Sequence, residues 1–105
     1  MTTINQLDWE VLNATADDWE SLETVYHQLG GSAASNGVGR SLSLAEIAEA
    51  IHRLCLQGQL TARRESGDFV RDYSDLGYVW RSWFSMTSEG RSTWSNLAPP
   101  ARASV

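Results

Sequence analysis

The chain contains no lysine, a single cysteine and two prolines among its 105 residues. Because one cysteine cannot form a disulfide within the chain, Cys55 favours a reducing, cytoplasmic setting. No run of about 18 apolar residues is present, so no membrane-spanning helix and no membrane partner are expected. The first ten residues, MTTINQLDWE, have neither the basic flank nor the apolar core that a signal peptide requires.

Basic residues are missing from the N-terminal third. Residues 1–39 contain six acidic residues and no basic one, whereas residues 40–105 hold all eight arginines of a chain whose net charge is −5. Nucleic-acid-binding domains are usually basic, so the acidic total argues against a general nucleic-acid binder. A local arginine surface can still attract phosphate, because the local field directs binding.

The motifs of common enzymes and metal sites are also missing. No Gly-x-Ser-x-Gly elbow occurs, and the glycine-rich segment 37–41 has neither the preceding strand nor the Lys-Ser/Thr ending of a phosphate-binding loop. His52 and Cys55 are spaced like two metal ligands on a helix, but zinc needs three or four ligands and the other histidine, His27, is remote. We therefore expect a non-enzymatic chain without metal or cofactor, with the acidic side chains of residues 8–23 in solvent.

The strongest pattern that is present runs from Ser43 to Arg64. Ser43 and Glu46 form a capping box, which predicts a helix start at this point. Gly58 is suited to end that helix, and the alternation of residues 59–63 predicts a strand. The apolar stripe of the helix is expected to be Leu44, Ile47, Ile51, Leu54 and Cys55. The opposite face, expected to be open to a partner, carries Ala45, Glu46, Glu49, Arg53, Leu56 and Gln57.

Two shorter helices are predicted before this segment. Apolar residues at helical spacing indicate the first over residues 4–13. Asp17 and Glu20 form a second capping signal, and the helix that they begin is expected to end at Gly30-Gly31. A Gly/Ser-rich loop over residues 30–42 then leads to the third helix.

A hairpin is predicted after the third helix. Residues 65–77 indicate its loop, and the aromatic run from Tyr78 to Met86 indicates its second strand. A short helix from residue 88 is expected to follow, within a single domain over residues 1–98, and residues 99–105 are expected to form a flexible tail. Four of the five tryptophans fit apolar, core-facing positions: Trp9, Trp19, Trp80 and Trp94.

Three helices, a hairpin and a last helix resemble the winged helix-turn-helix family. The likeness rests on SLAEIAEAIHRLCLQGQL, similar to a recognition helix that leads into a wing, and on WFSMTSEGR, similar to a strand-Thr-x-x-Gly step, and it covers roughly residues 4–97. It implies an α+β winged helix: a three-helix bundle with a two-stranded β-hairpin wing and a short C-terminal helix. About a dozen residues, Gly30 to Leu42, separate the second helix from the third, where the family usually has a tight turn.

The resemblance implies a transcription-regulator-like protein that binds double-stranded DNA. The third helix would then enter the major groove, with Arg53 as the candidate for reading bases. Glu46 and Glu49 on the same face would repel phosphate. The candidates for phosphate contacts, which suit bidentate guanidinium groups, lie on the wing or just before the helix: Arg40, Arg63, Arg64 and Arg71.

The alternative is an acidic winged-helix module that binds another protein and no DNA, since a fold does not determine a function. Its candidate contacts are the exposed Leu56 and the pair Arg81 and Trp83 on the outer face of the second hairpin strand. Trp83, with Thr61 or Arg63 as neighbour across the hairpin, is either part of an arginine–tryptophan surface stack or an interface anchor. A homodimer suits either function.

Overall fold

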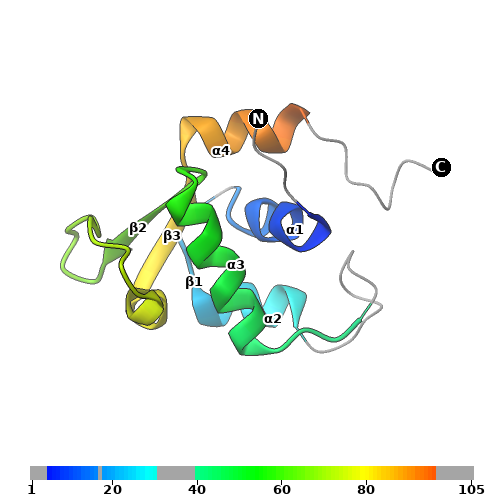
Figure 1. Ribbon diagram of the computed structural model, residues 1–105, viewed down its shortest axis with the longest axis horizontal. Coiled ribbons are helices and arrows are strands. Elements are labelled where there is room, and N and C mark those ends of the chain that lie inside the picture. Colours follow the sequence, from blue (N-terminus) through cyan, green and yellow to red (C-terminus); the bar gives the residue numbers. More distant parts are fainter. Residues whose placement is uncertain (1–4, 17, 31–39, 97–105) are drawn as a thin grey trace.

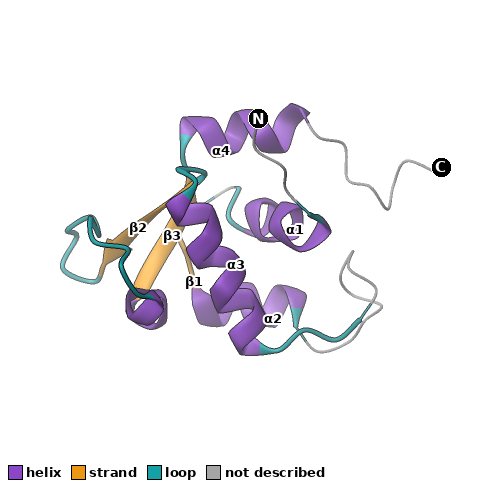
Figure 2. Cartoon of the chain, viewed as in Figure 1, coloured by secondary structure: helices purple, strands orange, loops and turns teal. Residues whose placement is uncertain are grey.

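The computed structural model describes residues 5–16, 18–30 and 40–96, which form an α+β domain. Helix α3 runs through its middle, with α1 and α2 on one side and a small antiparallel sheet on the other (Figure 1; Figure 2). The helices are α1 (Gln6–Ala14), α2 (Leu22–Leu29), α3 (Leu44–Leu56), the 3-10 helix η2 (Leu76–Arg81) and α4 (Ser88–Asn96). The strands are β1 (Glu20–Ser21), β2 (Leu60–Arg64) and β3 (Ser82–Met86).

Helix α3 forms as predicted. Ser43 Oγ accepts the backbone N–H of Glu46, and the Glu46 carboxylate accepts the N–H of Ser43, each at 3.1 Å. Gly58 follows the helix with a φ of +75°, a value that favours glycine. Four residues of the predicted stripe are buried, and Leu44 is half-buried. The core therefore assembles around this helix, as its apolar periodicity indicates.

The prediction for the start of α2 is wrong. Ser21 caps the helix by accepting the Thr24 N–H at 3.2 Å, and α2 begins at Leu22. Glu20 belongs to β1 instead, where it pairs with Phe84 of β3. Pairing to a neighbouring strand requires an extended backbone at residues 20–21, which moves the helix start past the predicted cap. Asp17 lies outside the described residues, and so does Ile4 of the predicted first helix.

The prediction of a two-stranded sheet is also corrected, because the sheet has three antiparallel strands in the order β1-β3-β2. In the register, Ser21 of β1 and Arg63 of β2 both face Trp83 of β3. A strand of two residues is too short to produce a visible alternation in the sequence, so β1 escaped detection.

The second hairpin strand was predicted from Tyr78, but it begins only at Ser82. The preceding residues form η2, capped by the Asp75 carboxylate, which accepts the Gly77 N–H at 2.8 Å. Within η2 Val79 is buried, and Trp80, predicted to face the core, is 51% exposed. An aromatic run favours a strand by composition, but the cap at Asp75 starts a tight helical turn locally.

The remaining elements close the domain. Trp9 is buried as predicted, Trp19 is half-buried, and Trp94 of α4 is half-buried with Nε1–H donating to Asn13 Oδ1 at 3.2 Å.

The predicted tail, residues 99–105, and most of the predicted loop over residues 30–42 lie outside the described residues. None of the described helices is both long and apolar enough to cross a bilayer.

Candidate functional site

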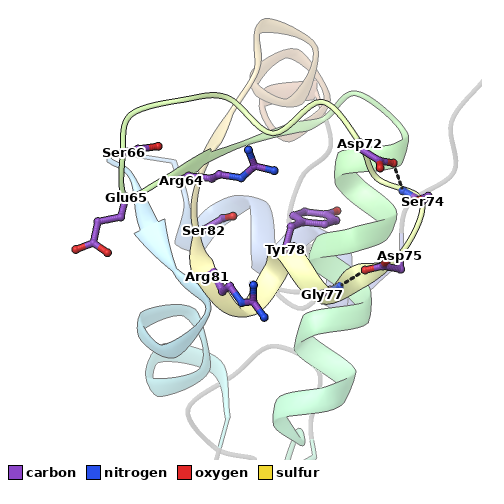
Figure 3. A pocket seen from close by; sticks show the side chains of 10 residues that line it. All are labelled: Arg64, Glu65, Ser66, Asp72, Ser74, Asp75, Gly77, Tyr78, Arg81 and Ser82. Atoms are coloured by element: carbon purple, nitrogen blue, oxygen red, sulfur yellow. Dashed lines mark hydrogen bonds between the residues drawn. The ribbon is translucent and has the colours of Figure 1, made fainter.

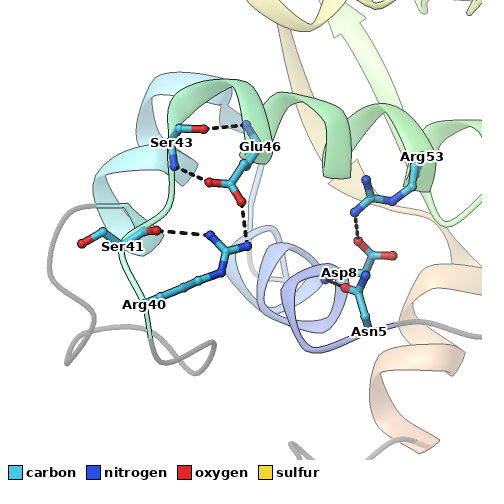
Figure 4. A network of polar contacts seen from close by, with 7 residues as sticks. All are labelled: Asn5, Asp8, Arg40, Ser41, Ser43, Glu46 and Arg53. Carbon is cyan, nitrogen blue, oxygen red and sulfur yellow. Dashed lines mark hydrogen bonds and ion pairs between the residues drawn. The ribbon is translucent and has the colours of Figure 1, made fainter.

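The arginines predicted to contact DNA fall into two groups, and the first is bound within the domain. Arg53 Nη2 lies 2.7 Å from Asp8 Oδ1, which joins α3 to α1 (Figure 4). The Asp8 side chain is only 4% exposed, so the prediction that it is solvated is wrong. Arg40 Nη2 lies 2.6 Å from Glu46 Oε2. Both guanidinium groups that were expected to serve the outer face of α3 therefore already have a carboxylate.

The Arg40–Glu46 pair controls the charge at the start of α3. The hydrogen bond from Arg40, followed by the bond from the Ser43 backbone, lowers the pKa of Glu46 to about 2. The same pairing raises the pKa of Arg40. At neutral pH both groups are charged and the pair is electrically neutral, which leaves Glu49 as an acidic group on the outer face of α3.

The second group of arginines lies on the hairpin. Arg63 Cζ is 4.4 Å from the centroid of the Trp19 ring, and Trp19 in turn meets Phe69 at a centroid distance of 6.2 Å. Arg63 faces Trp83 in the strand register, so of the two predicted neighbours, Thr61 and Arg63, the second is directly opposite. An arginine–tryptophan stack on this surface is formed by Arg63 with Trp19, whereas the sequence suggested a stack that involves Trp83.

Three further arginines of the hairpin region are exposed: Arg64, Arg71 and Arg81. The ion pairs found in the described part of the chain involve none of the three. Acidic side chains alternate with them along the loop, at Glu65, Asp68, Asp72 and Asp75. The hairpin thus carries arginines that are available to a ligand, on a surface of mixed charge.

A cavity lies between the end of β2, the loop after it and η2, and we call it the hairpin hollow (Figure 3). Arg64 and Arg81 lie on either side of Ser82, and the loop arches over them. Ser82 is 3% exposed and its Oγ has no hydrogen-bond partner. The other lining residues are Glu65, Ser66, Asp72, Ser74, Asp75, Gly77 and Tyr78.

A second depression, the aromatic groove, lies between α2, η2 and β3. The residues that line it include Tyr26, Leu44, Trp80, Arg81 and Trp83. Arg81 and Trp83, two residues predicted to contact a protein partner, thus line the same groove, and Trp80 lines it as well.

Leu56, the other predicted protein contact, is 58% exposed but does not line the groove. It stands twelve residues beyond Leu44 on α3, or about 18 Å along the helix axis.

A polar link anchors η2 to α3. The Tyr78 hydroxyl and His52 Nδ1 are 2.8 Å apart, and the Tyr78 ring packs on Tyr73. Cys55 is buried beside them, and its burial raises the pKa of the thiol to about 11. In the ranges that the structure describes, no three side chains of the metal-binding types gather at one place. Through its contact with Tyr78, His52 joins η2 to α3.

Comparisons of the chain with protein-family models, with curated proteins and with solved structures gave no match.

Proposed function

We propose that the chain is a winged-helix module that binds double-stranded DNA as a transcription-regulator-like protein, with the hairpin as its contact surface. Three helices followed by an antiparallel hairpin that projects from the body support this proposal (Figure 1). The observation that carries it is the set of hairpin arginines without a carboxylate partner. Arg64 and Arg71 are exposed, and neither is found in the ion pairs of the described residues.

The outer face of α3 has a minor part in this proposal. Arg53 and Arg40 are bound to Asp8 and Glu46, and Glu49 remains as a negative charge. Contacts made by the hairpin alone would go mainly to phosphates, which position a protein but carry no direct sequence information. Binding is therefore expected to be weak, salt-dependent and tolerant of sequence.

Fluorescence anisotropy with a labelled random duplex at low salt tests this proposal. Binding is expected at roughly micromolar protein, and log K should fall linearly with log salt. Arg71→Gln should reduce the magnitude of that slope by about 1, the effect of one lost phosphate contact. Arg40→Gln is the matched control: it removes an arginine already paired with Glu46, so the slope should stay unchanged. Absence of binding at low salt, or equal effects of the two variants, would contradict the proposal.

A second candidate function, binding to another protein without DNA, is favoured by the aromatic groove. Trp80 is 51% exposed there, beside Trp83 and Arg81. Tryptophan and arginine are the residues most enriched among the contacts that dominate protein interfaces. A second copy of the chain seated on this groove would give a homodimer.

Sedimentation velocity over a range of concentrations tests the homodimer. Trp80→Ser should shift the chain to the monomer, because the substitution removes the largest exposed apolar surface of the groove. Phe69→Ser is the control, since Phe69 is equally exposed at 51% but lies outside the groove. A monomer at every concentration, or dissociation by both variants alike, would count against the groove as a dimer interface.

A further inference from the structure

We propose that the hairpin hollow is a binding site for a small amino carboxylate, such as a free amino acid, whose carboxylate is held by Arg64, Arg81 and the Ser82 hydroxyl. This inference goes beyond DNA binding and does not depend on it.

The strand register places the three carboxylate-binding groups together. Arg64 of β2 faces Ser82 of β3, and Arg81 immediately precedes Ser82 in the chain. Figure 3 shows Arg64 and Arg81 on the same wall of the hollow, one above and one below Ser82, with their guanidinium groups apart from each other. Each guanidinium group can bind a carboxylate in the planar, bidentate geometry that arginine favours, and the hollow offers two of them.

Ser82 is the independent sign of a ligand. Its side chain lines the hollow, is almost fully buried and has no hydrogen-bond partner for Oγ. A buried hydroxyl without a partner is unfavourable, and most such groups in folded proteins are satisfied. A ligand carboxylate between the two arginines would accept the Ser82 O–H and satisfy it.

The acidic residues of the hollow decide which anion fits. Asp72 Oδ1 accepts the Ser74 N–H at 3.0 Å, and Asp75 Oδ1 accepts the Gly77 N–H at 2.8 Å. Both lie near α3, across the hollow from Ser82, and Glu65 points away from the arginines (Figure 3). These negative charges disfavour a phosphate dianion, since like charges repel at short range. They favour a zwitterionic ligand that carries an ammonium group as well as its carboxylate.

A thermal-shift screen tests this site, with the twenty L-amino acids, acetate and inorganic phosphate as separate probes. At least one amino acid should raise the melting temperature of the wild-type chain more than acetate or phosphate does. Calorimetric titration should then show binding weakened at least tenfold in Ser82→Ala and Arg81→Gln. Arg71→Gln is the matched control, because Arg71 lies outside the hollow, and its affinity for the amino acid should stay unchanged.

Ser82→Ala separates a ligand role from a structural one. Removing an unsatisfied hydroxyl should leave the ligand-free chain at least as stable as wild type, while binding of the amino acid is lost. Its affinity for duplex DNA should not change, so failure of this proposal and failure of DNA binding give different results. The site is refuted if no amino acid binds, if acetate or phosphate binds as well as any amino acid, or if both hollow variants retain affinity.

Discussion

Arg40 and Arg53 show how much the role of a charged side chain depends on its nearest partner. The family resemblance makes Arg40 a candidate for a phosphate contact and Arg53 a candidate for reading bases. In the folded chain each guanidinium group is held by a carboxylate, Glu46 and Asp8 respectively. An arginine so occupied has less to gain from a phosphate, because binding would first break an existing pair.

The Glu46 carboxyl group provides a titration prediction. Its pKa in the folded chain is about 2, below the ordinary value of 4.5, and the hydrogen bond from Arg40 is the largest cause. The stabilisation from this pair is therefore complete above pH 4.5 and is lost as the pH falls toward 2. Carbon-detected NMR of the Glu46 side chain should show the low pKa, and Arg40→Gln should raise it toward 4.5. Because the pair is exposed, the change in unfolding free energy should be small. An unchanged Glu46 pKa in the variant would contradict this account.

Gly90 is required by a close approach of backbones. Gly90 lies three residues after Thr87. The Thr87 hydroxyl donates to the Gly58 carbonyl at 2.5 Å and accepts the Gly90 N–H at 3.0 Å. A Cβ atom at position 90 would overlap the carbonyl oxygen of Gln59. This contact gives a physical reason for the glycine in the Thr-x-x-Gly step of the sequence.

Gly90→Ala should therefore destabilise the chain, although alanine favours a helix over glycine by about 1 kcal/mol. We expect a loss of about 1–3 kcal/mol in unfolding free energy, the usual effect of overpacking, measured by urea denaturation. Ser92→Ala, at an exposed position of the same helix, should change stability by less than about 0.5 kcal/mol. A Gly90→Ala variant as stable as wild type would show that α4 does not pack this closely on Gln59.

At the scale of elements, α3 organises the domain through one polar and one apolar face. Its apolar stripe meets α1, α2 and the sheet, while Arg53 on the other side reaches the buried Asp8 of α1. The N-terminus of α1 is itself capped by Asn5, whose side chain accepts the Asp8 N–H at 2.8 Å. The Arg53–Asp8 bond therefore links α3 to the first turn of α1.

Removing this link should cost stability. Arg53→Ala leaves the buried Asp8 carboxylate without its partner, and we expect a loss of about 1–3 kcal/mol in unfolding free energy. Glu49→Ala, an exposed substitution on the same helix, should stay within about 0.5 kcal/mol of wild type. In a double-mutant cycle, Asp8→Ala combined with Arg53→Ala should cost less than the sum of the single changes. Strict additivity would mean that the two side chains do not interact.

The described residues of the molecule share one apolar core. Buried residues from α1, α2, α3, η2 and all but the shortest strand form one cluster, and Trp94 of α4 packs against it. A small domain with one core usually unfolds in one cooperative step. Far-ultraviolet circular dichroism and tryptophan fluorescence should therefore give the same urea midpoint. Separate midpoints would show that α4 or the hairpin unfolds independently.

Local patterns in the sequence determined the central helix of this protein and the turn that follows it. The Ser43–Glu46 capping box, the apolar stripe of α3 and Gly58 together specify one helix and the turn into β2. They could be recognised because each depends on residues within a few positions of one another. The α+β class and the antiparallel hairpin were predicted from the order of the expected elements, with residues 65–77 as the loop between the two strands.

The tertiary structure decided which side chains meet. Arg53 binds Asp8, which lies 45 positions earlier in the chain. Arg63 of β2 stacks on the ring of Trp19, which lies just before β1. Strand β1 likewise depends on its pairing with β3, which no periodicity reveals. Helix η2 begins at a local cap, Asp75, although its aromatic residues favour a strand by composition. The candidate sites followed the same rule: the arginines were visible in the sequence, but their carboxylate partners, the unsatisfied Ser82 and the exposed Trp80 were not. Contacts between distant residues are created by the packing of whole elements, so they become visible only once the chain has folded.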